Sequence, residues 1–347
     1  MYILGIMSGT SLDGIDLALC SFSEKKGKFD FEIHRANSLA YPAEWQKKLS
    51  TSHSLPAFDL IKLHKDYGFF IGKVILDFLK DIPTQAHYIA SHGHTVFHQP
   101  NKSVTFQIGD GAAIAALCGI PVISDFRNLD VCLGGQGAPL VPIGDEMLFS
   151  EYDYCLNLGG FSNVSFNKNG IRKAFDICPV NIVLNEFAQK AGKDFDKAGE
   201  LGTMGHSYPA LVAELDNLEY YKRLSPKSLG REWLEKTFLP IIKKYNISIP
   251  DIMASLYEHI SNQLATVMEK KGKKILITGG GAFNTYLLEQ FQKKTNCTLI
   301  IPNSNLVNFK EALVFAFLGY LHINNKPNCL TSVTGAKRDS IGGCIFK

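Results

Sequence analysis

The chain has 347 residues, about twice the usual length of one domain, so two domains are expected. Its 36 Lys and Arg residues against 33 Asp and Glu residues give a formal net charge of +3, which is small for this length and argues against a nucleic-acid or membrane-surface binder. The eight cysteines form no CxxC pair. Reduced thiols and a cytoplasmic location are therefore expected, since the chain also starts without a secretory leader pattern and has no uninterrupted apolar stretch long enough to span a bilayer.

The first third of the chain predicts three strands followed by alternating helices and strands. The strands are expected at residues 2–6, 15–22 and 29–40, joined by a Gly-rich turn and by the charged turn SEKKGK. A helix at 56–80 follows, then strands at HYIASHG and VTFQIG, a helix at 110–118 and the strand IPVISDF.

The same order of elements restarts at Tyr152. It runs through the strands YCLNLGG, FSNVSFN and IRKAFDIC, helices at 179–191 and 249–271, the strand KKILITGG, a helix at 285–294, the strand CTLIIP and a helix at 310–324. This order predicts an α/β protein of two duplicated βββαβα-type domains with a nucleotide cleft between them, as in the superfold of actin, sugar kinases and heat-shock chaperones. The expected domains are residues 1–128, completed by about 326–347, and residues 129–325.

Three Gly-rich turns, each after an apolar strand, are the candidate nucleotide-binding segments. None matches a Walker or dinucleotide-binding pattern, and each alone is typical of a tight turn. Together they favour a nucleotide, because glycine lets backbone N–H groups approach an anion closely. The candidate residues are Gly9, Thr10, Ser11, Asp13 and Gly14 in the first turn, Gly159, Gly160 and Asn163 in the second, and Gly279, Gly280, Gly281 and Asn284 in the third.

Several longer motifs resemble those of one enzyme family over almost the whole chain. They are MSGTSLDGID, SHGHTVFHQP, FQIGDG, SDFRNLDVCLGGQGAPLVP, NLGGFSNVSF, FDICPVN, TGGGAFN and KEALVFAFL, in this order. The set resembles the anhydro-N-acetylmuramic acid kinase family. The resemblance implies an ATP-dependent enzyme that hydrolyses the 1,6-anhydro bridge of its sugar, phosphorylates O6 and gives N-acetylmuramic acid 6-phosphate in cell-wall recycling.

Two carboxylates are the candidate catalytic groups. Asp176, at the end of the strand KAFDIC, is the candidate general base that takes a proton from water, and we prefer this role to the alternative of capping the helix that follows. Glu311 lies where the family's EAxxFA block has a glutamate implied to orient water or sugar. A favourable position at a helix amino terminus explains Glu311 equally well.

The candidate substrate-binding residues surround two motifs in the first half. Arg127 is suited to clamp a lactyl carboxylate with two hydrogen bonds, although an interdomain ion pair is the alternative. His92 and His94 have a spacing that can bind zinc, but no Cys or acid partner is near, and contacts with sugar hydroxyls are preferred. The remaining candidates are Asp125, Gly135, Gln136 and Asn181.

The sequence departs from the family pattern in two places. The two glycines that flank proline in FDTGPGN are Cys178 and Val180 here, and the family's Gln within HGQT is His94. Side chains at 178 and 180 either crowd a ligand-binding loop or are a compensated packing variant. A kinase of another anhydro-sugar or hexose and a non-catalytic nucleotide-binding protein therefore remain alternatives.

The expected ligands are ATP, an anhydro-sugar and Mg2+. Magnesium is expected mainly on phosphate oxygens and water, with Asp13 and Asp176 as the nearest carboxylates. The resemblance also implies a homodimer, and neither a nucleic-acid nor a membrane partner is expected.

Overall fold

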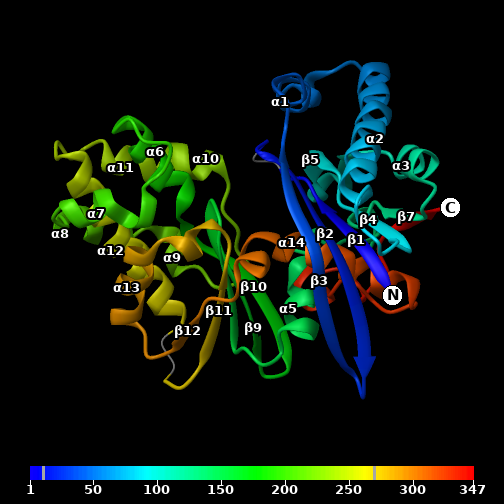
Figure 1. The fold of residues 1–347 in the computed structure, drawn as a ribbon. Coiled ribbons are helices and arrows are strands. Elements are labelled where there is room, and N and C mark those ends of the chain that lie inside the picture. Colours follow the sequence, from blue (N-terminus) through cyan, green and yellow to red (C-terminus); the bar gives the residue numbers. More distant parts are fainter. Residues whose placement is uncertain (10–11, 269–270) are drawn as a thin grey trace. The chain divides into compact units, whose positions relative to one another are not determined.

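The computed structural model describes residues 1–9, 12–268 and 271–347 (Figure 1). The chain divides into two compact units: unit 1 is Met1–Leu148 with Phe309–Lys347, and unit 2 is Phe149–Asn308. The boundaries expected from the order of elements, at residues 128 and 325, differ from these and stay predictions.

Unit 1 contains a six-stranded sheet in the order β13-β7-β4-β1-β2-β3 and a separate β5-β6 hairpin. Strands β1, β2 and β3 form an antiparallel meander, β4 and β7 add parallel to β1, and β13 closes the other edge antiparallel to β7. The strands are β1 (Tyr2–Met7), β2 (Gly14–Lys25), β3 (Lys28–Ala40), β4 (Tyr88–Ser91), β5 (His94–Gln99), β6 (Val104–Ile108), β7 (Val122–Ser124) and β13 (Cys344–Phe346).

The helices of unit 1 bury apolar faces on this sheet. The inner face of α2, including Tyr67, Ile71 and Ile75, packs on Leu4 and Leu17 of the meander. Gly5 of β1 lies against the backbone of α14, so close that a Cβ would overlap the carbonyl oxygen of Ala312. The helices are α1 (Ala43–Ser50), α2 (Ala57–Leu79), α3 (Gly111–Cys118), α4 (Asn128–Cys132), α5 (Val141–Leu148), α14 (Ser304–Ile323, shared with unit 2) and α15 (Thr331–Thr334), with short 3-10 turns at Ser52–Ser54 and Pro100–Lys102.

Unit 2 repeats the strand order of unit 1. Its sheet runs β10-β9-β8-β11-β12, with β8, β9 and β10 as an antiparallel meander and β11 and β12 parallel to β8. The strands are β8 (Tyr154–Leu158), β9 (Phe161–Lys168), β10 (Ile171–Pro179), β11 (Lys274–Thr278) and β12 (Thr298–Ile300). The shared order confirms the predicted α/β fold of two duplicated βββαβα halves.

The helices of unit 2 include a group of short helices that the sequence pattern did not predict. This group, α7 to α11, occupies residues 200–242, between the predicted helices at 179–191 and 249–271. The helices are α6 (Asn181–Lys190), α7 (Glu200–Met204), α8 (Pro209–Asp216), α9 (Glu219–Lys222), α10 (Arg231–Trp233), α11 (Leu239–Ile242), α12 (Ile249–Val267) and α13 (Thr285–Lys294), with 3-10 turns at Lys197–Gly199 and Gly280–Phe283 and a π-helical turn at Leu234–Phe238.

Helix α14 has a kink and an apolar composition. The kink lies at Phe309, whose φ of −114° is not helical, next to the change from unit 2 to unit 1. Among the described residues α14 alone is long and apolar enough overall to cross a membrane, although Lys310 and Glu311 interrupt its apolar residues. However, 67% of its apolar window is buried inside the structure, as in a core helix.

The packing at Gly5 generates a prediction about stability. Gly5→Ala is expected to lower the midpoint of thermal unfolding, because the added methyl must push β1 and α14 apart, at a cost of about 1–3 kcal/mol. Ala40→Val, at an exposed position at the end of the edge strand β3, is the control and should change stability by less than about 0.5 kcal/mol. An unchanged midpoint for Gly5→Ala would contradict this packing.

Candidate functional site

The strand β10 of unit 2 presents Asp176 at a β-bulge between Asp176 and Pro179. Its neighbours across the sheet are polar: Asn163 of β9 pairs with Asp176, and Asn157 of β8 pairs with Asn163. Because directly opposed residues of antiparallel strands share a face, the three side chains form a row across the meander. Asn157 was not a predicted site residue, and its only sequence signal is a polar residue within the buried strand YCLNL.

Three hydrogen bonds from residues 220–229 fix Asp176. Its carboxylate Oδ2 accepts from the Leu229 N–H at 2.9 Å, its carbonyl accepts from the Tyr220 hydroxyl at 2.7 Å, and its N–H donates to the Lys227 carbonyl at 3.3 Å. Within the described part of the chain no group donates to Oδ1, which is therefore the oxygen free to take a proton. Burial raises the pKa of Asp176, and the bond from Leu229 opposes the rise.

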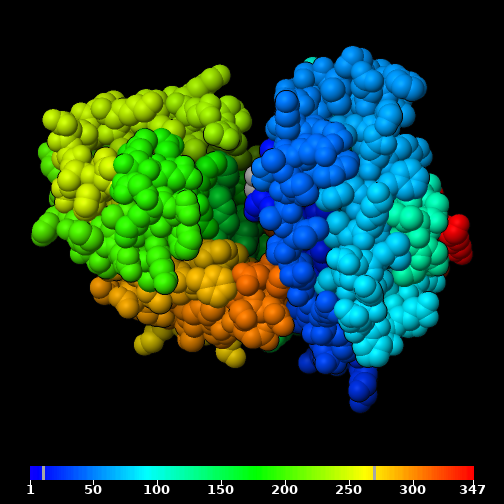
Figure 2. Space-filling model, turned by 45° about the horizontal axis from the view of Figure 1, so that its top comes forward, coloured from blue at the N-terminus to red at the C-terminus, as the bar shows by residue number. Residues whose placement is uncertain are grey.

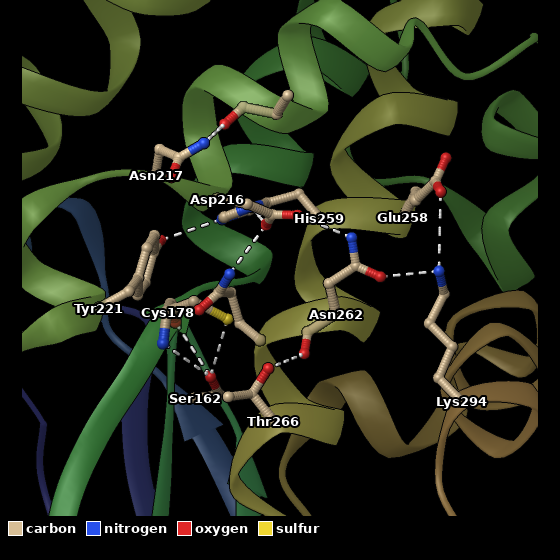
Figure 3. A network of polar contacts seen from close by, with 12 residues as sticks. Ser162, Cys178, Asp216, Asn217, Tyr221, Glu258, His259, Asn262, Thr266 and Lys294 are labelled. Carbon is tan, nitrogen blue, oxygen red and sulfur yellow. Dashed lines mark hydrogen bonds and ion pairs between the residues drawn. The ribbon is translucent and has the colours of Figure 1, made fainter.

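A partly buried polar network ties this segment to helix α12 (Figure 3). Asp216 accepts hydrogen bonds from His259 Nδ1 at 2.6 Å and from Asn262 Nδ2 at 2.8 Å. With its Nδ1 proton used in this way, His259 accepts at Nε2 from the Tyr221 hydroxyl at 3.0 Å. Tyr221 is adjacent to Tyr220, so the network holds the residue that hydrogen-bonds to Asp176.

The turn Gly159–Gly160 docks on the start of α6. The Gly160 carbonyl accepts from the N–H groups of Val180 and Ile182, and the Gly159 carbonyl accepts from Asn181. Since C=O and N–H point in opposite directions in a trans peptide, the N–H of Gly160 points away from α6. A Cβ on Gly160 would touch only Ile182, at 3.7 Å, so the surrounding protein leaves space there that a ligand can use.

The third Gly-rich turn contains glycines of two kinds. Gly279 has a φ of +82° and a Cβ there would meet Asn157, while a Cβ on Gly281 would meet Leu158, so the fold itself requires both glycines. A Cβ on Gly280 would meet only Asn181, at 3.7 Å. Gly280 is therefore the position of this turn that leaves room for a ligand.

Unit 2 contains a pocket of about 330 Å³ beside Gly280. This volume is at the lower end of the range for small-molecule sites. Two exposed phenylalanines, Phe195 and Phe283, line it, and a hydrogen-bonded chain from Asp196 through the Tyr257 hydroxyl to Asn284 supports its wall. The lining residues are Asn181, Leu184, Asn185, Phe195, Asp196, Lys197, Ala198, Tyr257, Gly280, Phe283 and Asn284.

Cys178 and Val180 point into the core of unit 2. Both are fully buried members of its main apolar cluster, and the Cys178 thiol lies 3.3 Å from the Ser162 hydroxyl. Because both side chains are 0% exposed, neither lies at a surface that a ligand can touch. Of the two readings of these departures from the family pattern, the packing variant agrees with the structure.

In unit 1, Arg127 is held by His92 and by a loop carbonyl. The Arg127 Nε donates to His92 Nε2 at 2.9 Å, and its Nη1 donates to the Gly137 carbonyl at 2.6 Å. His92 Nδ1 bonds to the Gly93 carbonyl at 2.7 Å, and burial lowers the pKa of His92 to about 3, so the ring is a neutral acceptor. Nη2 of Arg127 has no hydrogen-bond partner in residues 1–9, 12–268 or 271–347 and can bind an anion.

The loop that follows Arg127 is organised by the buried Asp130. Its carboxylate accepts from the Gly137 N–H at 2.8 Å and from the Thr334 hydroxyl at 2.7 Å. A Cβ on Gly135 would overlap this carboxylate, so Gly135 has a structural reason to be glycine. The Gln136 side chain is exposed, and its N–H donates to the Thr334 carbonyl at 2.8 Å.

His94 and Asp125 are the other predicted substrate residues of unit 1. His94 is only 4% exposed and its Nδ1 is buried without a hydrogen-bond partner in the described residues. Burial lowers the pKa of His94. Asp125 has a left-handed φ of +61°. Burial raises the pKa of Asp125, and hydrogen bonds from Asn128 lower it.

Glu311 lies just after the kink of α14. Desolvation raises the pKa of Glu311 and the charge of Asp16 raises it further, whereas Lys310 and Arg127 lower it. The side chain keeps an exposed surface, so water screens part of these effects. Asp16, whose charge acts on Glu311, was not predicted as a site residue. In the sequence GIDL it is only one polar position of an alternating strand.

The turn between β1 and β2 is described only in part. Thr10 and Ser11 lie outside the described residues. The Asp13 carbonyl accepts from the Tyr41 N–H at 3.4 Å, and a Cβ on Gly14 would overlap the backbone of Leu39, so pairing with β3 requires glycine there. Gly9 precedes the undescribed residues.

No group of three or more His, Cys, Asp or Glu side chains in the described ranges is arranged to hold a metal ion. Both ring nitrogens of His92 are used in hydrogen bonds, which removes it as a zinc ligand. Asp13 and Asp176, the predicted magnesium neighbours, lie in different units.

The comparisons identify one enzyme family. A family model described as anhydro-N-acetylmuramic acid kinase matches residues 1–347. The chain is 35% identical over 378 residues to an anhydro-N-acetylmuramic acid kinase of Haemophilus influenzae, covering 99% of this chain and 97% of the relative. It is also 34% identical over 373 residues to an anhydro-N-acetylmuramic acid kinase of Sulfurimonas denitrificans, and this match covers 100% of this chain and 99% of the relative.

Solved structures align less closely. A ligand-bound xylulose kinase from Lactobacillus acidophilus has a TM-score of 0.44 and 11% identity, covering 92% of this chain and 89% of that one. A similarity at that level carries no inference about activity.

The burial of Val180 generates a second stability prediction. Val180→Ala is expected to destabilise the protein by about 1–3 kcal/mol, because it leaves a cavity in the core of unit 2. Val104→Ala, at a position that is 44% exposed, is the matched control and should cost much less. Thermal unfolding measures both, and equal losses would mean that the Val180 side chain is not packed in a core.

Proposed function

The chain belongs to the anhydro-N-acetylmuramic acid kinase family, and on this premise we propose that it uses ATP to open and phosphorylate anhydro-N-acetylmuramic acid in cell-wall recycling. It is a kinase, a phosphotransferase with an alcohol group as acceptor. The observation that carries the proposal is the fixed carboxylate of Asp176, in which Oδ2 accepts a hydrogen bond and Oδ1 accepts none from the described part of the chain.

The proposed reaction couples hydrolysis to phosphoryl transfer. Asp176 Oδ1 takes a proton from water, the water oxygen bonds to the anomeric carbon, and the bond from that carbon to O6 breaks. The released O6 attacks the γ-phosphorus of ATP, whose bond to the bridging oxygen breaks to give ADP. The products are ADP and N-acetylmuramic acid 6-phosphate, and Asp176 returns its proton to solvent.

The open space beside Gly160 and beside Gly280 supports a place for the phosphates and a place for the nucleoside of ATP. The outward N–H of Gly160 is suited to a phosphate oxygen, and the pocket beside Gly280 is suited to a nucleoside between Phe195 and Phe283. In the first turn, the residues that we propose to lie near the phosphates are Gly9, Thr10, Ser11 and Asp13.

Magnesium fits as an ion carried by the nucleotide. The described residues offer carboxylates such as Asp13 and Asp176 but no cage of three ligands, which suits an ion held mainly by phosphate oxygens and water. When bound, it would neutralise charge on the phosphates.

Arg127 is the proposed reader of the lactyl carboxylate. His92 and the Gly137 carbonyl orient its guanidinium and leave Nη2 for the ligand. We also propose that the sugar or the attacking water lies near Asn181, Asp125, Gln136 and Glu311. His94 favours a second candidate, an anhydro-sugar with a different hydroxyl pattern, because its buried Nδ1 has no hydrogen-bond partner among the residues that the structure describes.

A substrate panel tests the choice between these sugars. With ATP and magnesium, purified protein should turn over anhydro-N-acetylmuramic acid far faster than the anhydro-sugar that lacks only the lactyl group. Arg127→Gln should remove most of this difference by raising KM for the lactyl sugar. Equal kcat/KM for both sugars in the wild type would support the second candidate and overturn the first.

The role of Asp176 predicts a loss of turnover without a loss of nucleotide binding. Asp176→Asn should lower kcat by about 100-fold or more, because the general base is removed. Since burial raises the pKa of Asp176, the wild-type rate should fall with decreasing pH at a midpoint above the ordinary value of 3.8. Steady-state kinetics across pH measure both effects. The exposed Asp30→Asn is the control, and full activity of Asp176→Asn would exclude the base.

The pocket of unit 2 predicts an effect on ATP alone. Phe195→Ala and Phe283→Ala should each raise KM for ATP by about ten-fold, as expected for loss of an aromatic surface against a base, and leave KM for the sugar unchanged. Met204→Ala, at another exposed apolar position of unit 2, is the control. An unchanged KM for ATP in both variants would contradict the proposal that the nucleoside binds in this pocket.

A further inference from the structure

The segment 220–229, whose two ends hydrogen-bond to Asp176, carries one basic side chain that is partly buried. In Figure 2 the yellow-green residues, which include this segment, form part of the outer surface of unit 2. Lys222 and Arg223 are exposed there, whereas Lys227 is half-buried. Because an ammonium group is strongly hydrated, a lysine that loses water on folding needs contacts that replace it.

The ammonium group of Lys227 closes the segment on itself. Its Nζ donates to the carbonyls of Tyr220 and Tyr221, at 3.2 Å and 3.5 Å. Both residues belong to the short helix α9, and the last carbonyls of a helix have no partner within it. The lysine therefore fastens the end of the loop to its beginning.

The same ammonium group lies over two aromatic rings beside Asp176. Nζ is 4.7 Å from the centroid of the Tyr220 ring and 5.5 Å from that of the Phe175 ring. A cation is attracted to a ring face within about 6 Å of the centroid. Phe175 precedes Asp176 on β10, and the Tyr220 hydroxyl donates to the Asp176 carbonyl. The Lys227 side chain thus contacts both the residue before Asp176 and a residue that hydrogen-bonds to it.

The backbone of Lys227 makes a further contact with Asp176. Its carbonyl accepts from the Asp176 N–H at 3.3 Å. Among the residues that the structure describes, no carboxylate forms an ion pair with Lys227, and its charge is met by two carbonyls and two rings. A neutral substitute at 227 therefore leaves no carboxylate without its partner.

We propose that Lys227 is a positioning residue for Asp176, which holds the candidate base in place by joining the rings of Phe175 and Tyr220 to the end of α9. This role rests on the proposed function of Asp176. Because the ammonium group is engaged by protein carbonyls and rings, Lys227 acts through Asp176 and not on the sugar or the nucleotide. A carboxylate whose support is loosened loses the alignment that proton transfer requires.

The first test separates turnover from binding. Lys227→Met, which keeps the length of the side chain and removes its charge and donors, should lower kcat by about ten-fold or more. KM for ATP and for the sugar should stay within about two-fold of wild type, because Lys227 binds neither. Lys227→Arg should recover kcat to within about three-fold of wild type, because it keeps a cation and its donors.

Lys222→Met is the matched control, the same substitution at an exposed lysine of the same segment, and it should keep the wild-type kcat. All variants are assayed below their midpoints of thermal unfolding, so that folded protein is compared. A wild-type kcat for Lys227→Met, or a Lys227→Arg variant no faster than Lys227→Met, would overturn the role of Lys227.

A double-mutant cycle then distinguishes positioning of Asp176 from a general effect on the structure. In the Asp176→Asn background, Lys227→Met should change kcat by less than about two-fold, because the base that it positions is already absent. An equal loss in both backgrounds would overturn the role of Lys227 and leave the base in place. Full activity of Asp176→Asn would instead overturn the proposed function, and the role of Lys227 with it.

Discussion

The hydrogen bonds that hold Asp176 are the interaction on which the proposed chemistry depends. The Leu229 N–H occupies one carboxylate oxygen, and the Tyr220 hydroxyl fixes the backbone beneath it. A base placed at a bulge of an edge strand needs such support, because a loose carboxylate loses the alignment that makes proton transfer fast. The Asp216–His259–Tyr221 network extends the support to α12, so a long helix of unit 2 contributes to the position of one oxygen atom.

Local sequence patterns predicted the repeated strand order and the family. Both meanders, the helix at 285–294 and the main bounds of α2 followed from alternation, helical periodicity and turn residues. The motif order led to the family that the comparisons then gave. Asp176 stood at a strand end in the sequence, and the structure places it there beside Asn163.

Contacts between residues far apart in the chain could not be predicted from the sequence. Nothing in YYKRLSPKSLG marks Tyr220 or Leu229 as partners of Asp176, because the contacts join residues 44 and 53 positions apart. The same holds for Asp130, whose loop is closed by Thr334. Glycine patterns were also ambiguous: only the space around each Cβ separates Gly279, required by the fold, from Gly280, which leaves room for a ligand. The sequence left Cys178 and Val180 as either a crowded loop or a packing variant, and their burial in the core favours the packing variant.

In the proposed reaction Asp176 activates water against the anomeric carbon while O6 receives the phosphoryl group. The most direct measurement is a single turnover in oxygen-18 water with ATP, magnesium and anhydro-N-acetylmuramic acid, analysed by mass spectrometry. The proposed reaction places one heavy oxygen at C1 of the phosphorylated sugar and none in its phosphate. Label in inorganic phosphate, or a phosphorylated sugar with its anhydro bridge intact, would contradict it.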